Sequence, residues 1–139
     1  MTKLQVSSLL SLLVFGLSTT SPLLAAERMK AGEWEFSTTT QGQGTRTFKK
    51  CLTPADAASV NGDEKTGRAA AEKSAGPHCA LKEYKIVGET VSYALACDSS
   101  AISSTATYRG DSFEGTMTAK RQGKESTTRV KARRLGACP

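Results

Sequence analysis

Short turn signals recur through the second half of the chain and constrain its fold more than any other feature. They are Gly88-Glu89, Arg109-Gly110-Asp111 and Gln122-Gly123, and each separates two segments in which apolar and polar residues alternate. Such alternation is typical of half-buried β-strands, and a tight turn between two of them indicates a β-hairpin. Strands joined by short turns pair with their sequence neighbours, so this half of the chain predicts an antiparallel meander.

We expect about seven strands, because a further hairpin is indicated around Gly42-Gln43-Gly44. The predicted strands span residues 32–41, 45–51, 79–87, 90–97, 101–108, 112–120 and 124–135. An open sheet would leave free edges, so we expect it to curl into a small barrel or fold into a sandwich. The side chains expected to face inward include Trp34, Phe36, Phe48, Tyr84, Val91, Tyr93, Leu95, Tyr108, Phe113, Met117 and Val130.

One short helix is predicted after the second strand. Thr53 is a suitable N-cap, Pro54 suits the first helical position, and Asp56 complements the helix dipole. Asn61-Gly62 is expected to end this helix. Residues 63–77 contain no large apolar side chain, which predicts a solvated linker with at most a transient helix.

The N-terminal residues are typical of a secretory signal peptide. Lys3 precedes an apolar run over residues 9–17, Pro22 breaks that run, and Ala25-Ala26 offers small residues for cleavage. An uncleaved anchor helix is the alternative, and we disfavour it because the apolar run is short. We therefore expect a signal peptide over residues 1–26, a single domain over residues 27–139, and a periplasmic location.

All four cysteines lie after the expected cleavage site, and an even number in an exported chain indicates disulfides. Cys79 and Cys97 are equidistant from Gly88, so they face each other if the hairpin is centred there. Cys51 then pairs with Cys138 by elimination, although the other connectivities remain open. The chain has a single His and no Cys-x-x-Cys pair, so we expect neither a metal site nor a cofactor.

Four ordered motifs resemble one family of small exported proteobacterial proteins, domain-of-unknown-function family 3617. They are residues 29–35 (MKAGEWE), 51–54 (CLTP), 110–115 (GDSFEG) and 131–138 (KARRLGAC). The resemblance covers nearly the whole expected domain and implies an exported β domain, but it implies no activity. Relatives often carry a longer loop between the first two strands, rich in Met and Pro, whereas here that loop spans only residues 39–45.

Trp34 and Arg133 suggest a barrel closure similar to that of lipocalins, in which an Arg from the last strand, here Arg133 or its neighbour Arg134, covers a Trp from the first. In that arrangement the open end of the barrel would hold a small ligand. The alternative, which we favour, is that Trp34 is simply a large core residue.

A basic cluster is the second candidate site. It comprises Lys120, Arg121, Lys124, Arg129, Lys131 and Arg133. Such a face can bind anionic lipid, lipopolysaccharide or an acidic polymer, but we favour the alternative of a solvated face that protects a sheet edge. No aromatic residue interleaves these charges, so single-stranded nucleic acid is disfavoured.

Catalysis has little support in the sequence. His78 is the only His, it stands beside an expected disulfide, and no Gly-x-Ser-x-Gly motif is present. We therefore expect no catalytic residue and no enzyme. The favoured hypothesis is a non-enzymatic ligand-binding module, and the alternative is an envelope interaction protein that uses its basic face. A lined cavity on the order of a few hundred Å³ would favour the first hypothesis, and a filled core would favour the second.

Overall fold

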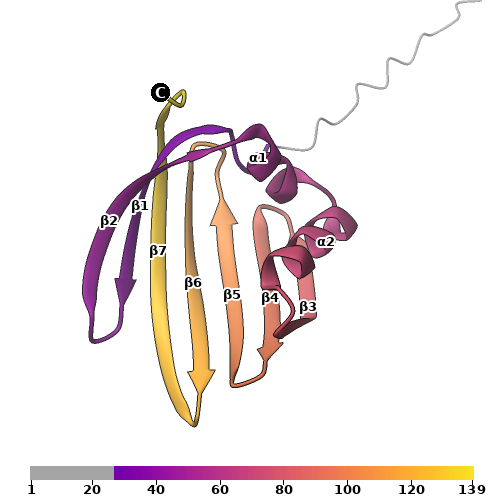
Figure 1. The fold of residues 1–139 in the computed structure, drawn as a ribbon. Helices are drawn as coiled ribbons and strands as arrows, with labels where there is room; N and C mark the ends of the chain where they lie inside the picture. Colours follow the sequence, from indigo (N-terminus) through magenta and orange to yellow (C-terminus); the bar gives the residue numbers. More distant parts are fainter. Residues whose placement is uncertain (1–26) are drawn as a thin grey trace, which may run out of the picture.

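A computed structural model describes residues 27–139, which form one seven-stranded sheet and two helices (Figure 1). The strands are β1 (Gly32–Thr40), β2 (Gly44–Leu52), β3 (Cys79–Val87), β4 (Thr90–Cys97), β5 (Ser100–Tyr108), β6 (Ser112–Arg121) and β7 (Lys124–Gly136). The expected signal peptide lies outside the described residues.

The strands are antiparallel throughout and lie in the order β2-β1-β7-β6-β5-β4-β3. The predicted meander is confirmed from β3 to β7, where each strand pairs with the next one along the chain. The β1–β2 hairpin joins the sheet because β1 pairs with β7. The first and last strands are therefore neighbours, as Figure 1 shows.

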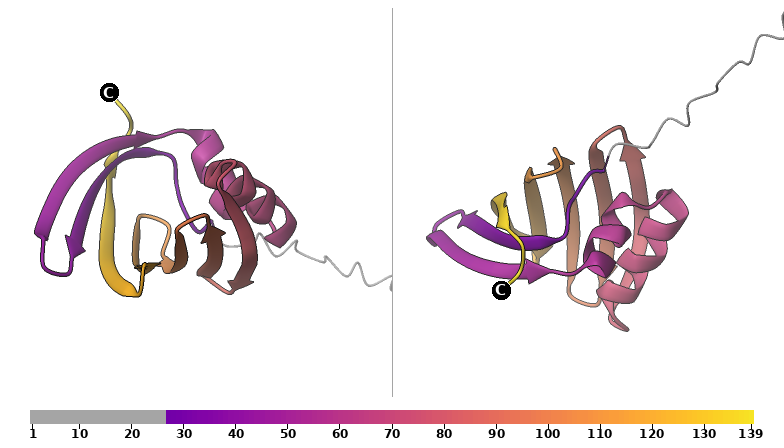
Figure 2. Two further views of the ribbon diagram at one scale, coloured as in Figure 1. Left: turned by 60° about the horizontal axis from the view of Figure 1, so that its bottom comes forward. Right: turned by 90° about the horizontal axis from the view of Figure 1, so that it is seen from above.

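The predicted closure into a barrel or sandwich is wrong. The sheet is a strongly curved trough whose edges, β2 and β3, stay apart (Figure 2). Both helices lie inside the curve, with α2 (Glu64–Ala75) against β3 and α1 (Pro54–Asn61) between α2 and the end of β2, and they occupy space into which a closing sheet would have to move. The helices thus cover part of the concave side, which we call the inner face, and leave the convex outer face to solvent.

The helix predicted after β2 is confirmed as α1 (Pro54–Asn61). Its capping box is complete, because Thr53 Oγ1 accepts from Asp56 N at 3.2 Å and Asp56 Oδ2 accepts from Thr53 N at 2.8 Å. Two hydrogen bonds at the start of the helix thereby satisfy amide groups that the helix itself leaves free.

The predicted solvated linker is wrong, because most of it forms a second helix, α2 (Glu64–Ala75). Asp63 caps it by accepting from Thr66 N at 2.8 Å. The helix packs on β3 through small residues, with Gly67 buried. A helix can approach aromatic side chains on a sheet closely without carrying a large apolar residue of its own. The lack of such residues in this segment therefore does not exclude a packed helix.

Every aromatic residue of the described chain stands on the inner face of the sheet. The strand register places all seven there: Trp34, Phe36, Phe48, Tyr84, Tyr93, Tyr108 and Phe113. Trp34 is fully buried in a cluster with Met29, Leu52 and Ala132. From this cluster a chain of ring contacts runs across the trough, with centroids 5.1 Å apart for Phe36–Phe48 and 5.9 Å for Phe36–Phe113.

The inner face is only partly covered. Tyr84 and Val91 are buried as predicted, whereas Met117 is 37 % exposed and Phe48 is 48 % exposed. Met117 stands where neither helix reaches, and Phe48 lies on the edge strand β2. Burial on this face therefore follows the helices rather than the strand alternation alone.

Two disulfides hold the fold together, with the pairing expected from the hairpin. Cys79 bonds to Cys97 and Cys51 to Cys138. Cys79 and Cys97 are also register partners in β3 and β4. Among residues 27–139, neither helix has the length and apolar character needed to cross a membrane.

Candidate functional site

The predicted barrel-closure pair, Trp34 with Arg133, does not form. Arg133 lies on the outer face, where its Nη2 atom is 2.8 Å from Glu35 Oε1. Arg134 is the register partner of Trp34, and its Nε donates to Ala31 O at 2.8 Å. Side chains alternate along a strand, so only one of two adjacent arginines can face Trp34.

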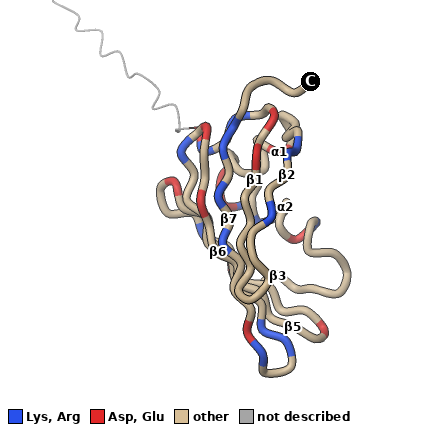
Figure 3. Tube along the Cα trace, turned by 90° about the vertical axis from the view of Figure 1, so that its left-hand side faces the viewer, with Lys and Arg blue, Asp and Glu red and all other residues tan. Residues whose placement is uncertain are grey.

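The predicted basic cluster does not form one face. Lys120, Arg129, Lys131 and Arg133 stand on the outer face, and the register places Arg121 and Lys124 on the inner face. Lys120 pairs with Glu125 at 3.2 Å, and Arg133 pairs with Glu35. Basic and acidic residues therefore mix over these strands and their tips (Figure 3), which is the pattern of a solvated surface.

His78 lies at the end of the sheet beside the Cys79–Cys97 disulfide. Its Nδ1 atom is 3.0 Å from Asp98 Oδ2, and both side chains are largely exposed. Neither residue lines a hollow of the inner face described below. Within residues 27–139, no group of three potential metal ligands is close enough to hold an ion.

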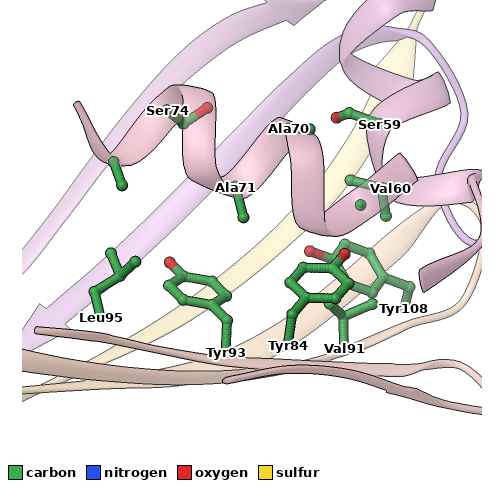
Figure 4. A pocket seen from close by; sticks show the side chains of 12 residues that line it. Ser59, Val60, Ala70, Ala71, Ser74, Tyr84, Val91, Tyr93, Leu95 and Tyr108 are labelled. Carbon is green, nitrogen blue, oxygen red and sulfur yellow. The ribbon is translucent and has the colours of Figure 1, made fainter. Parts of the chain in front are cut away.

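The inner face contains a cleft of about 320 Å³ between α2 and the sheet, which we call the inner cleft (Figure 4). Tyr84, Val91, Tyr93, Leu95 and Tyr108 form its floor. Its roof consists of small residues, Ser59, Val60, Gly67, Ala70, Ala71, Ser74 and Ala75. The cleft exists because small side chains on the helices face large ones on the strands and do not fill the space between them.

Gly67 sets the distance between roof and floor. A Cβ atom at this position would lie 2.1 Å from Tyr84 Oη, well inside van der Waals contact. The ring of Tyr84 can therefore reach the helix backbone only because residue 67 has no side chain. This contact fixes one end of the inner cleft.

All three tyrosines of the chain line the inner cleft. Figure 4 shows that their hydroxyl groups point from the sheet towards the helices. None of the three hydroxyls has a hydrogen-bond partner within the described chain, yet none is sealed from solvent. The cleft is thus an apolar space with three hydroxyl groups free to donate or accept.

Burial raises the pKa of the Tyr108 phenol to about 12, and it raises the pKa of Tyr84 as well. An ionised phenol would lose hydration in the cleft, so the neutral form is favoured. Both groups therefore remain neutral hydrogen-bond donors at physiological pH.

We expect the free energy of unfolding to fall as the pH rises from 10 to 12. A tyrosine in the unfolded chain loses its proton near pH 10, whereas folded Tyr108 retains it until about pH 12. Above pH 10 the unfolded state binds fewer protons, so stability should decrease by about 1.4 kcal/mol per pH unit and by roughly 2 kcal/mol in total. Urea unfolding across this range measures the loss.

Tyr108→Phe should flatten this pH dependence, because phenylalanine has no proton to release. Tyr93→Phe is the matched control, since it also removes a phenol from the inner cleft, and it should leave most of the slope in place. If Tyr108→Phe unfolds with an unchanged slope, the burial of Tyr108 is not its cause.

A second hollow of about 360 Å³ lies on the same inner face, beside the first and towards β1 and β2. We call it the outer groove because it is nearer the edge strand β2. Its lining is mainly apolar and consists of Met29, Phe36, Phe48, Leu52, Val60 and Phe113, with Lys50, Asp56 and Ser59 as the polar members. Ser59 and Val60 of α1 line both hollows. The end of α1 therefore stands between the inner cleft and the outer groove.

The segment before β1 fixes the end of α1 in this position. Arg28 is buried, and its Nε donates to Val60 O at 2.8 Å. Asn61 Oδ1 accepts from Met29 N at 2.8 Å, and Asn61 Nδ2 donates to Met29 O at 2.7 Å. The Arg28 cation also lies at the C-terminal end of α1, where the helix dipole is negative. Sequence reasoning missed these hydrogen bonds, because they join residues far apart in the chain.

The model of one protein family, described as "Protein of unknown function (DUF3617)", matches residues 29–138. No curated protein and no solved structure matches the chain. Comparison with known proteins therefore supplies a family but no activity, and the inner face remains the best-formed candidate site.

Proposed function

Since the chain belongs to the DUF3617 family of proteins of unknown function, we propose a function from the geometry of its inner face: this protein is a non-enzymatic module that binds a small apolar or amphiphilic ligand. The observation that carries the proposal is the partly covered aromatic trough. Each of its two hollows exceeds 300 Å³, which falls in the lower part of the range for small-molecule sites.

The chemistry of the trough suits binding rather than catalysis. Aromatic rings and aliphatic side chains provide apolar contact area, and the three tyrosine hydroxyls can orient a polar group. The one His–Asp pair lies outside both hollows, so no histidine is placed to act as an acid or base on a bound molecule. The proposal includes a periplasmic location, which agrees with two disulfides in a small domain.

We expect Ala71→Phe to weaken binding of a neutral apolar fluorophore, N-phenyl-1-naphthylamine, by about tenfold or more. Ala71 lines the inner cleft, and a phenyl ring there would occupy the space that the ligand needs. A loss of about 1.4 kcal/mol or more in binding, roughly tenfold, corresponds to excluding even part of an apolar ligand. Fluorescence titration measures the affinity.

Ala69→Phe is the matched control, because Ala69 lies on the same helix but is exposed and lines neither hollow. It makes the same chemical change and should leave the affinity as in the original protein. Circular dichroism should show both variants folded. If the probe fails to bind the original protein, the proposed binding function is wrong. If both variants bind it equally well, the inner cleft is not its binding site.

A further inference from the structure

Acidic side chains of the sheet are confined to its outer face, where cations stand beside them, whereas the inner face carries cations alone. The acidic residues of the described strands all have register positions on the outer face: Glu33, Glu35, Glu83, Glu114 and Glu125. The inner face of the same strands carries cations: Arg46, Lys50, Arg121, Lys124 and Arg134. A concave surface with charges of one sign concentrates ligands of the opposite sign.

Two of these cations flank the exposed ring at the outer groove. Arg46, Phe48 and Lys50 alternate along β2, so they project from one face with the two cations roughly 13 Å apart at the backbone. Within residues 27–139, neither Arg46 nor Lys50 has a carboxylate within 4.0 Å. Lys50 lines the outer groove directly. Exposed apolar surface here adjoins two cations that form no ion pair, although Asp56 is close enough to Lys50 to interact with it electrostatically.

Asp56 is the one acidic residue that lines the outer groove. Its Oδ2 atom already accepts hydrogen bonds from Thr53 N and Thr53 Oγ1, each at 2.8 Å. These bonds hold the carboxylate at the start of α1. An anionic group would therefore be favoured on the other side of Lys50, towards Phe48 and Arg46.

We propose that the ligand is a single-chain amphiphile with an anionic head group, bound with its head at Lys50 and Arg46 and its chain in the outer groove. This inference rests on the proposed binding function and adds the ligand class and its orientation. The chain contacts Phe36, Phe48 and Phe113 beneath α1, and the head group stays at the solvent-exposed edge of the trough. The apolar chain then contacts the apolar lining of the groove, and the anionic head group contacts the two cations.

Direct titration of the protein with four ten-carbon amphiphiles, below their micelle concentrations and followed by isothermal titration calorimetry, tests the orientation. The amphiphiles are decanoate, decyl phosphate, 1-decanol and decyltrimethylammonium. We expect the two anions to bind about tenfold more tightly than the cation, with the alcohol in between. Shortening decanoate by one methylene should weaken binding about fourfold if that methylene is buried. Preference for one anion over the other distinguishes a carboxylate from a phosphate head.

The double variant Arg46→Gln/Lys50→Gln should lose this preference for anions and keep its affinity for the fluorophore and for 1-decanol. Lys49→Gln is the matched control, because Lys49 lies on the same strand but faces outward. It should retain the preference. Binding of all four amphiphiles with equal affinity, or an equal loss in the control, overturns the proposed ligand class and leaves the binding function intact. Failure of every probe to bind overturns both.

Discussion

Replacing Cys51 and Cys138 together with Ser should lower the free energy of unfolding by about 4.5 kcal/mol. This disulfide closes a loop of 87 residues, and the entropy that a cross-link removes from the unfolded chain increases with loop length. It also attaches β2 to the residues that follow β7, with β1 in between. A domain of this size has only about 5–15 kcal/mol of stability, so the loss is a large fraction of the total.

The matched control is the double replacement Cys79→Ser/Cys97→Ser. That disulfide closes a loop of 18 residues, for which we expect a smaller loss of about 3 kcal/mol. Denaturant unfolding of both variants and the original protein, without reductant, gives the ranking. If the variant lacking Cys79–Cys97 proves the less stable of the two, loop closure does not govern the contribution of these bonds.

Replacing Gly32 with Ala should lower the free energy of unfolding by about 3 kcal/mol or more, a large fraction of the stability of a domain of this size. The φ angle of Gly32 is +142°, in a region that residues with a side chain rarely adopt. A Cβ atom there would lie 2.2 Å from Gly136 O and 2.7 Å from Arg134 Nε. The end of β7 would have to move away from β1, next to the buried Trp34. Thermal or denaturant unfolding measures the effect.

Gly44→Ala separates the cost of the positive φ angle from the cost of the close contact with β7. Gly44 also has a positive φ, +83°, but a Cβ atom there would meet nothing within 4 Å. It should cost about 1 kcal/mol, the backbone term alone. The excess loss in Gly32→Ala then measures the close approach of β7. Equal losses in the two variants would show that the end of β7 moves away from residue 32 at little cost in stability.

The strand order from β3 to β7 could be predicted from the sequence because it depends on local signals, whereas the pairing of β1 with β7 joins distant segments and was not predicted. Glycine-containing turns and alternating residues specify hairpins one by one, and the Cys79–Cys97 pairing follows from the centre of its hairpin. The N-terminus of α1 was equally accessible, since Thr53 and Asp56 form a capping box within four consecutive residues. Each of these features is determined by residues close together in the chain.

The errors concern features that depend on distant parts of the chain. Whether a curved sheet closes is decided by what lies inside it, and α2 could not be recognised there because its contact surface is made of Gly67 and alanines. Because the side of α2 that faces the sheet carries only small side chains, the tyrosines predicted to lie in a packed core instead form the floor of the inner cleft. The wrong partner for Trp34 was avoidable, because the alternation that places Val130 inward also places Arg134 inward.

The two disulfides have a further consequence through their place in the sheet. Each of the two edge strands carries one cysteine of a different disulfide, Cys51 on β2 and Cys79 on β3. Edge strands present unpaired backbone groups that can template pairing with another chain. Before oxidation, both edges of the sheet lack their covalent attachment at the same moment. We therefore expect reduced molecules to pair edge to edge more readily than oxidised ones, so that disulfide formation limits this route to aggregation.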